Sequence, residues 1–106
     1  MDLETIARFA HQLVQEYHPG LADKERQKTE VEISTKVASM VDNDIYEAIS
    51  DDQLKHLMQM VESGHDSDEE IAGYIQEIGI DIDAIQSRAM ARFKEDYQAS
   101  VAKVVA

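Results

Sequence analysis

Cysteine is absent from this sequence of 106 residues, and proline and glycine are rare, with one and four copies respectively. Without cysteine the chain has no disulfide, no thiolate metal ligand and no cysteine nucleophile. The scarcity of proline and glycine favours long helices over many short strands, because strands need more turns to connect them. A lack of cysteine also fits a reducing compartment.

Long apolar runs are absent too. No window approaches the roughly 20 apolar residues that a membrane helix needs. Arg8, His11 and Gln12 interrupt the first apolar positions, so the N-terminal segment does not match a signal peptide. We therefore expect a soluble, cytoplasmic protein. Apolar residues still make up 43% of the chain, enough for a core, and its length predicts a single helical domain over residues 1–106.

Basic residues are scarce, with ten Lys and Arg against 22 Asp and Glu, and the net charge is −12. The imbalance lies in residues 41–83, which contain thirteen acids and one base, Lys55. Direct binding to nucleic acid requires a basic surface, so this charge argues against it. An anionic membrane would be repelled as well. The acidic middle predicts a basic protein partner, or a surface that imitates a nucleic-acid backbone.

The last part of the chain has the pattern of a helix with one buried face, from Ile82 to Val104. Its length is about 23 residues, which corresponds to roughly 34 Å. We expect it to be the central or longest helix, with shorter helices packed along it. The predicted buried face occupies one third of the helical wheel at about 100° per residue, and its residues are Ile82, Ile85, Ala89, Phe93, Tyr97 and Val104.

Two earlier helices are predicted in the first half of the chain. Asp2 can cap the first, which residues 18–20 end with a His-Pro-Gly sequence. The second is predicted from Ala22 to Ile49 and begins with a polar stretch of alternating charge. The alternative is a break near Asn43, which would divide this segment into two helices.

Two shorter helices follow, and each opens with a capping box, Ser50 with Gln53 and Ser67 with Glu70. Each is also followed by a glycine, Gly64 or Gly79, which suits a helix stop. Asp81 or Asp83 caps the final helix. The predicted inward apolar residues of the two short helices are Leu54, Leu57, Met58, Val61, Ile71, Tyr74, Ile75 and Ile78. The fold class is therefore all-α, a compact four- or five-helix bundle with a long C-terminal helix.

Four short motifs stand between Ile49 and Gln98. They are a Ser-Asp-Asp-Gln-Leu start at 50–54, a Glu-Ser-Gly stop at 62–64, an Asp-Glu-Glu-Ile start at 68–71 and Phe-Lys-Glu-Asp-Tyr at 93–97. Together they resemble small uncharacterised all-helical bacterial proteins. The resemblance implies a helical fold and no assigned activity.

The acidic residues of the middle segment are the candidate partner-binding site. Seven of the thirteen stand at helix starts, where a carboxylate stabilises the helix by about 0.3–1 kcal/mol. Capping and solubility are therefore the alternative explanation for them. The predicted partner-binding residues are Asp51, Asp52, Asp66, Asp68, Glu69, Glu70, Glu77, Asp81 and Asp83.

Metal and catalytic patterns are incomplete in this sequence. Four acids from Asp66 to Glu77 fit a calcium-loop frame, but Ile71 occupies the sixth position, where the turn requires glycine. Glu62 and His65 have the spacing of a di-iron ligand pair, but the helix is predicted to end between them. There is no nucleophile elbow and no phosphate-binding loop. We expect no metal, no cofactor and no enzymatic activity.

Apolar residues off the main stripes indicate a possible homodimer. Methionine adapts its shape and is common on surfaces that bind partners, and an exposed apolar end often marks association. The predicted interface residues are Met60, Met90, Val101, Val104 and Val105. The main prediction is a non-enzymatic module that binds a basic protein, like an inhibitor, immunity protein, antitoxin or nucleic-acid mimic. The alternative is a homo-oligomeric structural or scaffold protein assembled through helices 22–49 and 82–104.

Overall fold

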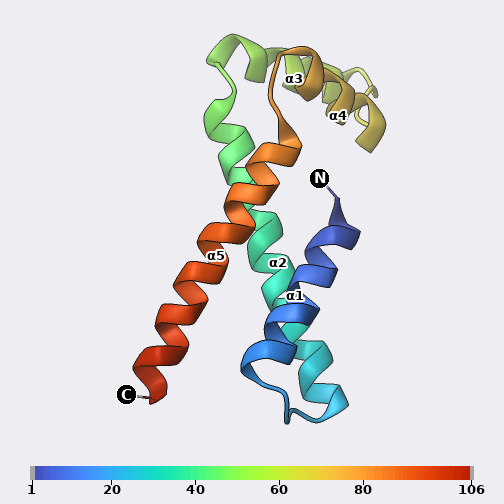
Figure 1. The fold of residues 1–106 in the computed structure, drawn as a ribbon. Helices are drawn as coiled ribbons and strands as arrows, with labels where there is room; N and C mark the ends of the chain where they lie inside the picture. The colour runs from blue at the N-terminus through green and yellow to red at the C-terminus, as the bar shows by residue number, and fades with distance from the viewer. Residues whose placement is uncertain (1, 106) are drawn as a thin grey trace.

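The computed structural model describes residues 2–105, and the side chains of residues 2–101. Within residues 2–105 there are five helices and no strand, which confirms the all-α class and the long C-terminal helix. The elements in chain order (Figure 1) are α1 (Leu3–Tyr17), α2 (Asp23–Ala48), α3 (Asp51–Glu62), α4 (Asp68–Glu77) and α5 (Ile82–Val105).

Three long helices, α1, α2 and α5, form an elongated bundle, and α3 and α4 lie across one end of it (Figure 1). The molecule measures 50 × 25 × 17 Å, with a radius of gyration of 16.6 Å. A spherical domain of about 100 residues has a radius of gyration near 13 Å. The chain is therefore longer and thinner than an ordinary domain of its size.

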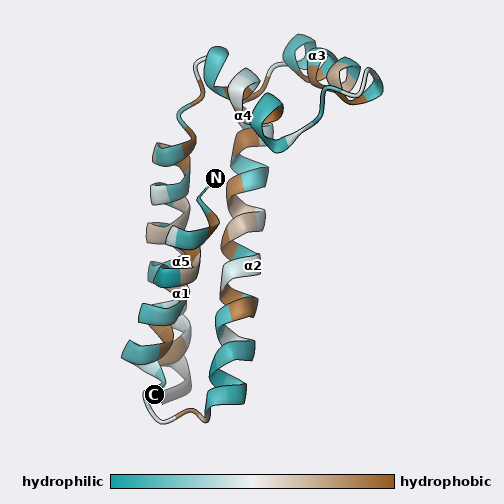
Figure 2. Cartoon of the chain, turned by 90° about the vertical axis from the view of Figure 1, so that its right-hand side faces the viewer, coloured by the Kyte–Doolittle hydropathy of each residue, from teal (hydrophilic) through white to brown (hydrophobic). Residues whose placement is uncertain are grey.

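The core is a row of aliphatic side chains between these long helices. α1 and α2 supply most of it, at the three- and four-residue spacing of a buried helix face, and Figure 2 shows apolar positions recurring along α2. Within residues 2–101, α5 adds two residues and α4 adds one. The buried apolar residues are Ile6, Ala10, Leu13, Val14, Ile33, Val37, Val41, Ile45, Ile75, Ile85 and Ala89.

The expectation that the final helix is the central or longest one was wrong. α2 has 26 residues against 24 in α5, and α2 packs against both α1 and α5, which touch each other more sparingly. Among the described side chains of the predicted α5 face, only Ile85 and Ala89 are buried, whereas Phe93 and Tyr97 are half-buried. The side chain of Val104 lies outside the described residues.

The second helix is continuous through Asn43. It spans Asp23–Ala48, close to the predicted bounds, and Val41 and Ile45 are buried on either side of Asn43. An uninterrupted four-residue spacing of apolar side chains keeps one face of the helix on the core. The alternative of two helices is therefore not observed.

Glycine ends α3 and α4 as predicted. Gly64 has φ +80°, in the left-handed region that residues with a Cβ avoid. The His65 N–H donates to the Met60 carbonyl at 2.8 Å and the Gly64 N–H to the Val61 carbonyl at 3.1 Å. These two bonds make a Schellman motif, and Gly79, with φ +88°, ends α4 with the same pair of bonds.

The two predicted capping boxes differ. Ser50 and Gln53 form both reciprocal hydrogen bonds, so the first box is complete. Ser67 accepts from the Glu70 N–H at 3.2 Å, but the Glu70 carboxylate lies 3.2 Å from Nδ1 of His65. The Glu70 side chain thus contacts the preceding loop. The hydrogen bond from the Ser67 N–H to the Glu70 side chain, which would complete the second box, is not among the bonds observed.

An aromatic cluster joins α1, and His18 directly after it, to α5. Phe9 meets Phe93 edge-to-face with ring centroids 6.3 Å apart, and Tyr17 meets Tyr97 in the same way at 5.6 Å. The Tyr97 hydroxyl lies 2.6 Å from Nε2 of His18. Burial raises the pKa of Tyr97 above its ordinary value of 10.0. Such ring pairs stabilise by about 0.5–1.5 kcal/mol each beyond the area that they bury.

Candidate interaction surface

Most of the net negative charge lies at one end of the molecule. We call residues 50–81 the head; they comprise α3, α4 and the segments around them. The head contains nine acids and one base, a net charge of −8, and the remainder of the chain contains thirteen acids and nine bases, a net charge of −4. The fold therefore separates a strongly acidic end from a bundle that is close to balanced.

α4 attaches the head to the bundle. Ile75 is buried in the core cluster, and Ile71 and Ile80 are half-buried against it. α3, in contrast, contributes no buried residue among the twelve that the structure describes for it. α3 is therefore the outer layer of the head, and Figure 2 shows that it stands clear of the long helices although it carries apolar positions.

Contacts between the two short helices hold α3 in place. The rings of His56 and Tyr74 are stacked, with centroids 4.6 Å apart and planes 23° from parallel. The Tyr74 hydroxyl also points at the Gln53 carbonyl, 3.5 Å away, at the long limit for a hydrogen bond. α3 runs out to the tip of the head and α4 returns from it.

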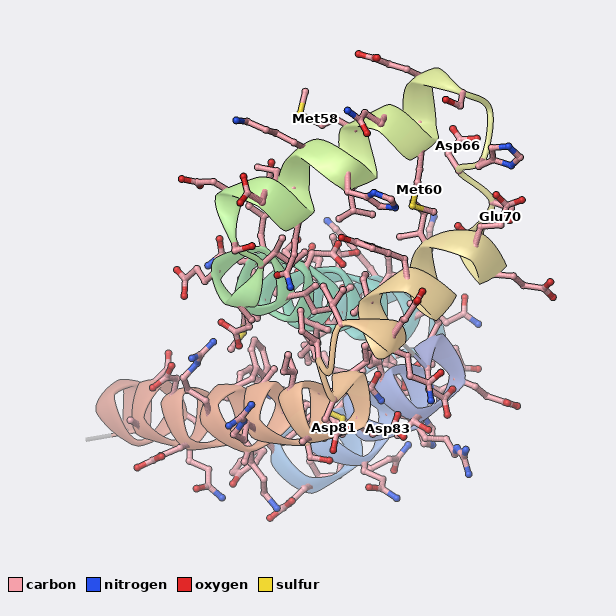
Figure 3. The ribbon with its side chains drawn as sticks, turned by 90° about the horizontal axis from the view of Figure 1, so that it is seen from above. Met58, Met60, Asp66, Glu70, Asp81 and Asp83 are labelled. Carbon is pink, nitrogen blue, oxygen red and sulfur yellow. The ribbon has the colours of Figure 1, made fainter. Side chains whose placement is uncertain are left out.

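All nine predicted partner-binding residues are exposed, but they do not form one compact face. Figure 3 shows Asp66 and Glu70 at the tip of the head, away from Asp81 and Asp83 near the start of α5. Asp68 and Glu69 belong to the tip group, since they lie in the first turn of α4. Asp51 and Asp52 open α3, about 18 Å from its other end. Glu77 ends α4, nearer to the bundle.

The head acids are not neutralised by Lys or Arg side chains. For residues 2–101, every ion pair to Lys or Arg is made by Asp23, Glu30 or Asp44, all in α2. Within the head, Glu70 contacts His65 at 3.2 Å, an ion pair only when that histidine is protonated. The head thus presents carboxylates of one sign to solvent, which produces a negative potential around it.

The predicted inward orientation of two α3 side chains was wrong. Met58 is 57% exposed and Val61 is 53% exposed, because no described element covers that side of α3. The predicted interface residue Met60 is half-buried instead and lies between α3 and α4, whereas Met58 points away from α4 (Figure 3). The exposed methionine of the head is therefore Met58.

The other predicted interface residues lie far from the head. Met90 is half-buried against the core and lines an open hollow of about 340 Å³ beside Phe9, between α1 and α5. Val101 is half-buried near the end of α5. The side chains of Val104 and Val105 lie outside the described residues. The structure thus does not bring Met60, Met90 and Val101 onto one surface.

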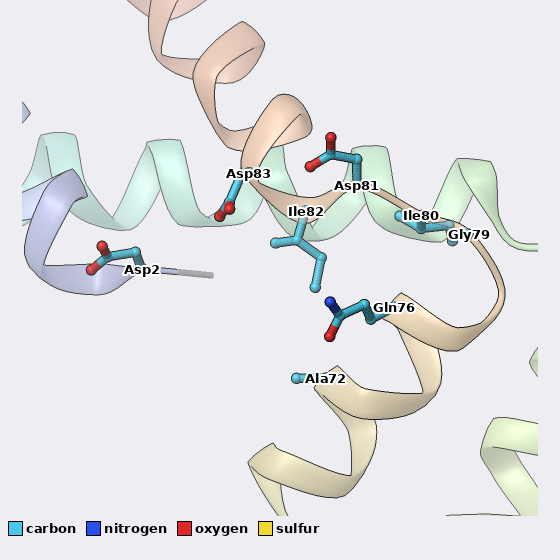
Figure 4. Close-up of a pocket in the computed structure, with 8 residues that line it drawn as sticks. All are labelled: Asp2, Ala72, Gln76, Gly79, Ile80, Asp81, Ile82 and Asp83. Atoms are coloured by element: carbon cyan, nitrogen blue, oxygen red, sulfur yellow. The ribbon is translucent and has the colours of Figure 1, made fainter.

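A hollow of about 620 Å³ lies where α4, the start of α5 and the N-terminal segment meet. Ile82 extends into it toward Gln76, and Asp2, Asp81 and Asp83 surround it (Figure 4). Two of these carboxylates cap helices. Asp81 accepts from the Ala84 N–H at 3.0 Å and so caps α5.

Asp2 caps α1 in a similar way. Its carboxylate accepts hydrogen bonds from the Thr5 hydroxyl, the Thr5 N–H and the Glu4 N–H, which lower the pKa of Asp2 below 3.8. Its N–H donates to Oε1 of the buried Gln86 at 2.8 Å. Across residues 2–101, no three His, Asp or Glu side chains converge on a metal position. The carboxylates of Asp2 and Asp81 therefore cap α1 and α5, and the Asp2 backbone links the start of α1 to α5.

No family model, curated protein or solved structure matches the chain. None of the described helices is both long and apolar enough to cross a membrane.

Proposed function

We propose that this chain is a non-enzymatic protein-interaction module whose acidic head binds a basic surface on another protein. The observation that supports this proposal is the concentration of net charge −8 in residues 50–81, with no ion pair to Lys or Arg among the head acids described. Capping explains acids at helix starts. It does not explain Glu62, Asp66 and Glu77, which stand elsewhere and are equally exposed.

A head of one charge sign favours rapid association with a partner of the opposite sign. Complementary potentials speed diffusional encounter and disfavour acidic competitors. The interaction should weaken as salt rises, because the Debye length is about 8 Å at physiological ionic strength and shorter at higher salt. By analogy of fold and charge, the module would act as an inhibitor, immunity protein, antitoxin or nucleic-acid mimic.

The test reverses the three head acids that capping does not explain, with the triple substitution Glu62→Lys, Asp66→Lys and Glu77→Lys. Native lysate is passed over immobilised wild-type and variant protein at low and high salt, and retained proteins are identified by mass spectrometry. We expect the wild type to retain a basic protein at low salt that the variant loses. Far-UV circular dichroism verifies that the variant is helical.

A matched control carries three reversals on exposed acids of the bundle, Glu16→Lys, Glu32→Lys and Glu95→Lys. The change in net charge is the same, so a general charge effect would alter both variants equally. The proposal predicts that the bundle variant keeps the partner. If both variants lose it equally, or if the retained protein is acidic, the head is not the binding surface.

One observation favours the alternative of a homo-oligomeric scaffold. Val31 and Tyr46 of α2 are 65% and 61% exposed. They are 15 residues apart, which places them within about 60° of each other around the helix and about 22 Å apart along it. An apolar contact between copies would survive high salt. Sedimentation at low and high salt tests it, and a monomer under both conditions would exclude the scaffold.

A further inference from the structure

The outer side of α3 carries an apolar strip. Met58 and Val61 are more than half exposed, and Leu54 is half-buried beside them. At about 100° per residue, Leu54 and Val61 lie within about 60° of Met58, so the three side chains follow one line over two turns. Together they form a helix face about 10 Å long, which is open to solvent at Met58 and Val61.

Acids border this strip. On the helical wheel, Asp51 and Glu62 lie about 20° and 40° from Met58, on the side away from Val61. Asp51 stands at the beginning of the strip and Glu62 at its end. Asp66 extends the acidic border beyond the tip of α3 (Figure 3). The one base of the head, Lys55, lies on the same edge as the two α3 acids.

The charge around the strip selects among the molecules that could cover it. A second copy docking head to head would bring two groups of net charge −8 together, which is repulsive. An anionic membrane is repelled in the same way. A cationic partner with an apolar face satisfies both parts of the surface, because its Lys and Arg meet the bordering acids while its apolar side chains cover Met58 and Val61.

We infer that the outer face of α3 binds a basic amphipathic helix of the partner protein. This inference rests on the proposed function and names the kind of segment that the head would bind. The i, i+4, i+7 spacing of Leu54, Met58 and Val61 matches the apolar line that a packed helix presents. Methionine at the centre adapts to side chains of different shape.

The test measures binding of synthetic peptides to the full chain. The probe is a peptide of about 14 residues, roughly 21 Å when helical, with leucines on one face and lysines on the other. The control peptide has the same composition in an order that gives no apolar face. Fluorescence anisotropy gives both Kd values at low salt. We expect the amphipathic peptide to bind at least about tenfold more tightly, a difference of about 1.4 kcal/mol.

Two variants locate the effect. The double substitution Met58→Gln and Val61→Gln removes the apolar strip at exposed positions, and it should abolish the advantage of the amphipathic peptide. Val31→Gln removes an exposed apolar side chain of similar exposure from the bundle and should leave that advantage unchanged.

The outcomes separate this inference from the proposed function. If both peptides bind equally and the head charge reversals weaken both, the head binds basic partners by charge alone and the α3 face is not the site. If neither peptide binds at low salt, the inference and the proposed function both fail. If Val31→Gln removes the advantage as completely as the α3 double variant, the apolar contact lies on the bundle and the inference is refuted.

Discussion

The separation of core and head makes a sharp prediction about stability. Leu13 of α1 and Met58 of α3 are both large apolar residues, but Leu13 is 2% exposed and Met58 is 57% exposed. Replacing each with alanine removes a similar amount of side chain. We expect Leu13→Ala to lower the free energy of unfolding strongly, and Met58→Ala to leave it almost unchanged.

The magnitudes follow from burial. A buried Leu→Ala substitution costs about 2–5 kcal/mol, because transfer energy is lost and a cavity remains. Domains of this size have about 5–15 kcal/mol of stability in total. Leu13→Ala therefore removes a large share of it. An exposed substitution usually changes stability by no more than about 0.5 kcal/mol, which is the range expected for Met58→Ala.

Urea unfolding followed by far-UV circular dichroism measures both variants. The midpoint should fall for Leu13→Ala with the slope unchanged, which indicates a change in stability rather than in the surface exposed on unfolding. A loss of more than about 2 kcal/mol in Met58→Ala would place α3 inside the cooperative core. A loss below about 1 kcal/mol in Leu13→Ala would contradict the packing of α1 on α2.

Two further predictions concern the head and the aromatic cluster. Gly79→Ala should destabilise α4 by about 1–2 kcal/mol, because φ is +88° there although no atom lies within 4 Å of the added Cβ. Gly73→Ala, in the helix interior with equal space, should stabilise α4. Hydrogen exchange of the α4 amides measures both variants, and equal effects would refute the strain assigned to Gly79. Because burial raises the pKa of Tyr97, the unfolded chain loses this proton first, so stability should fall as pH rises above 10.0. Tyr97→Phe should make that fall in stability less steep. If the free energy of unfolding of the variant and of the wild type fell in parallel with pH, the prediction would be wrong.

Local signals in the sequence were sufficient for most helix boundaries. Ser50 caps α3 and Gly64 ends it, as predicted, because a cap or a left-handed turn involves residues within a few positions of one another. The second capping box was predicted less well. Glu70 has the expected spacing from Ser67, but its carboxylate contacts His65, a competing partner that the capping pattern does not include.

Burial was predictable only where another helix covers the apolar stripe. Val37 and Met58 both occur in helical apolar patterns, yet Val37 is fully buried and Met58 is exposed. Periodicity states which residues share a face, and it does not state what lies opposite that face. The contact between His18 and Tyr97 could not be predicted for the same reason, since these residues are 79 positions apart in the sequence.

The sequence by itself determined that the chain is helical, where its helices begin and end, and that its acids concentrate in the middle. These properties depend on neighbouring residues and on counting charges. Only the tertiary structure decided that α2 is the helix on which α1 and α5 pack, and that α3 keeps an apolar side open among acids. Such features depend on how distant segments meet, because burial is a property of the surroundings of a side chain and not of its type.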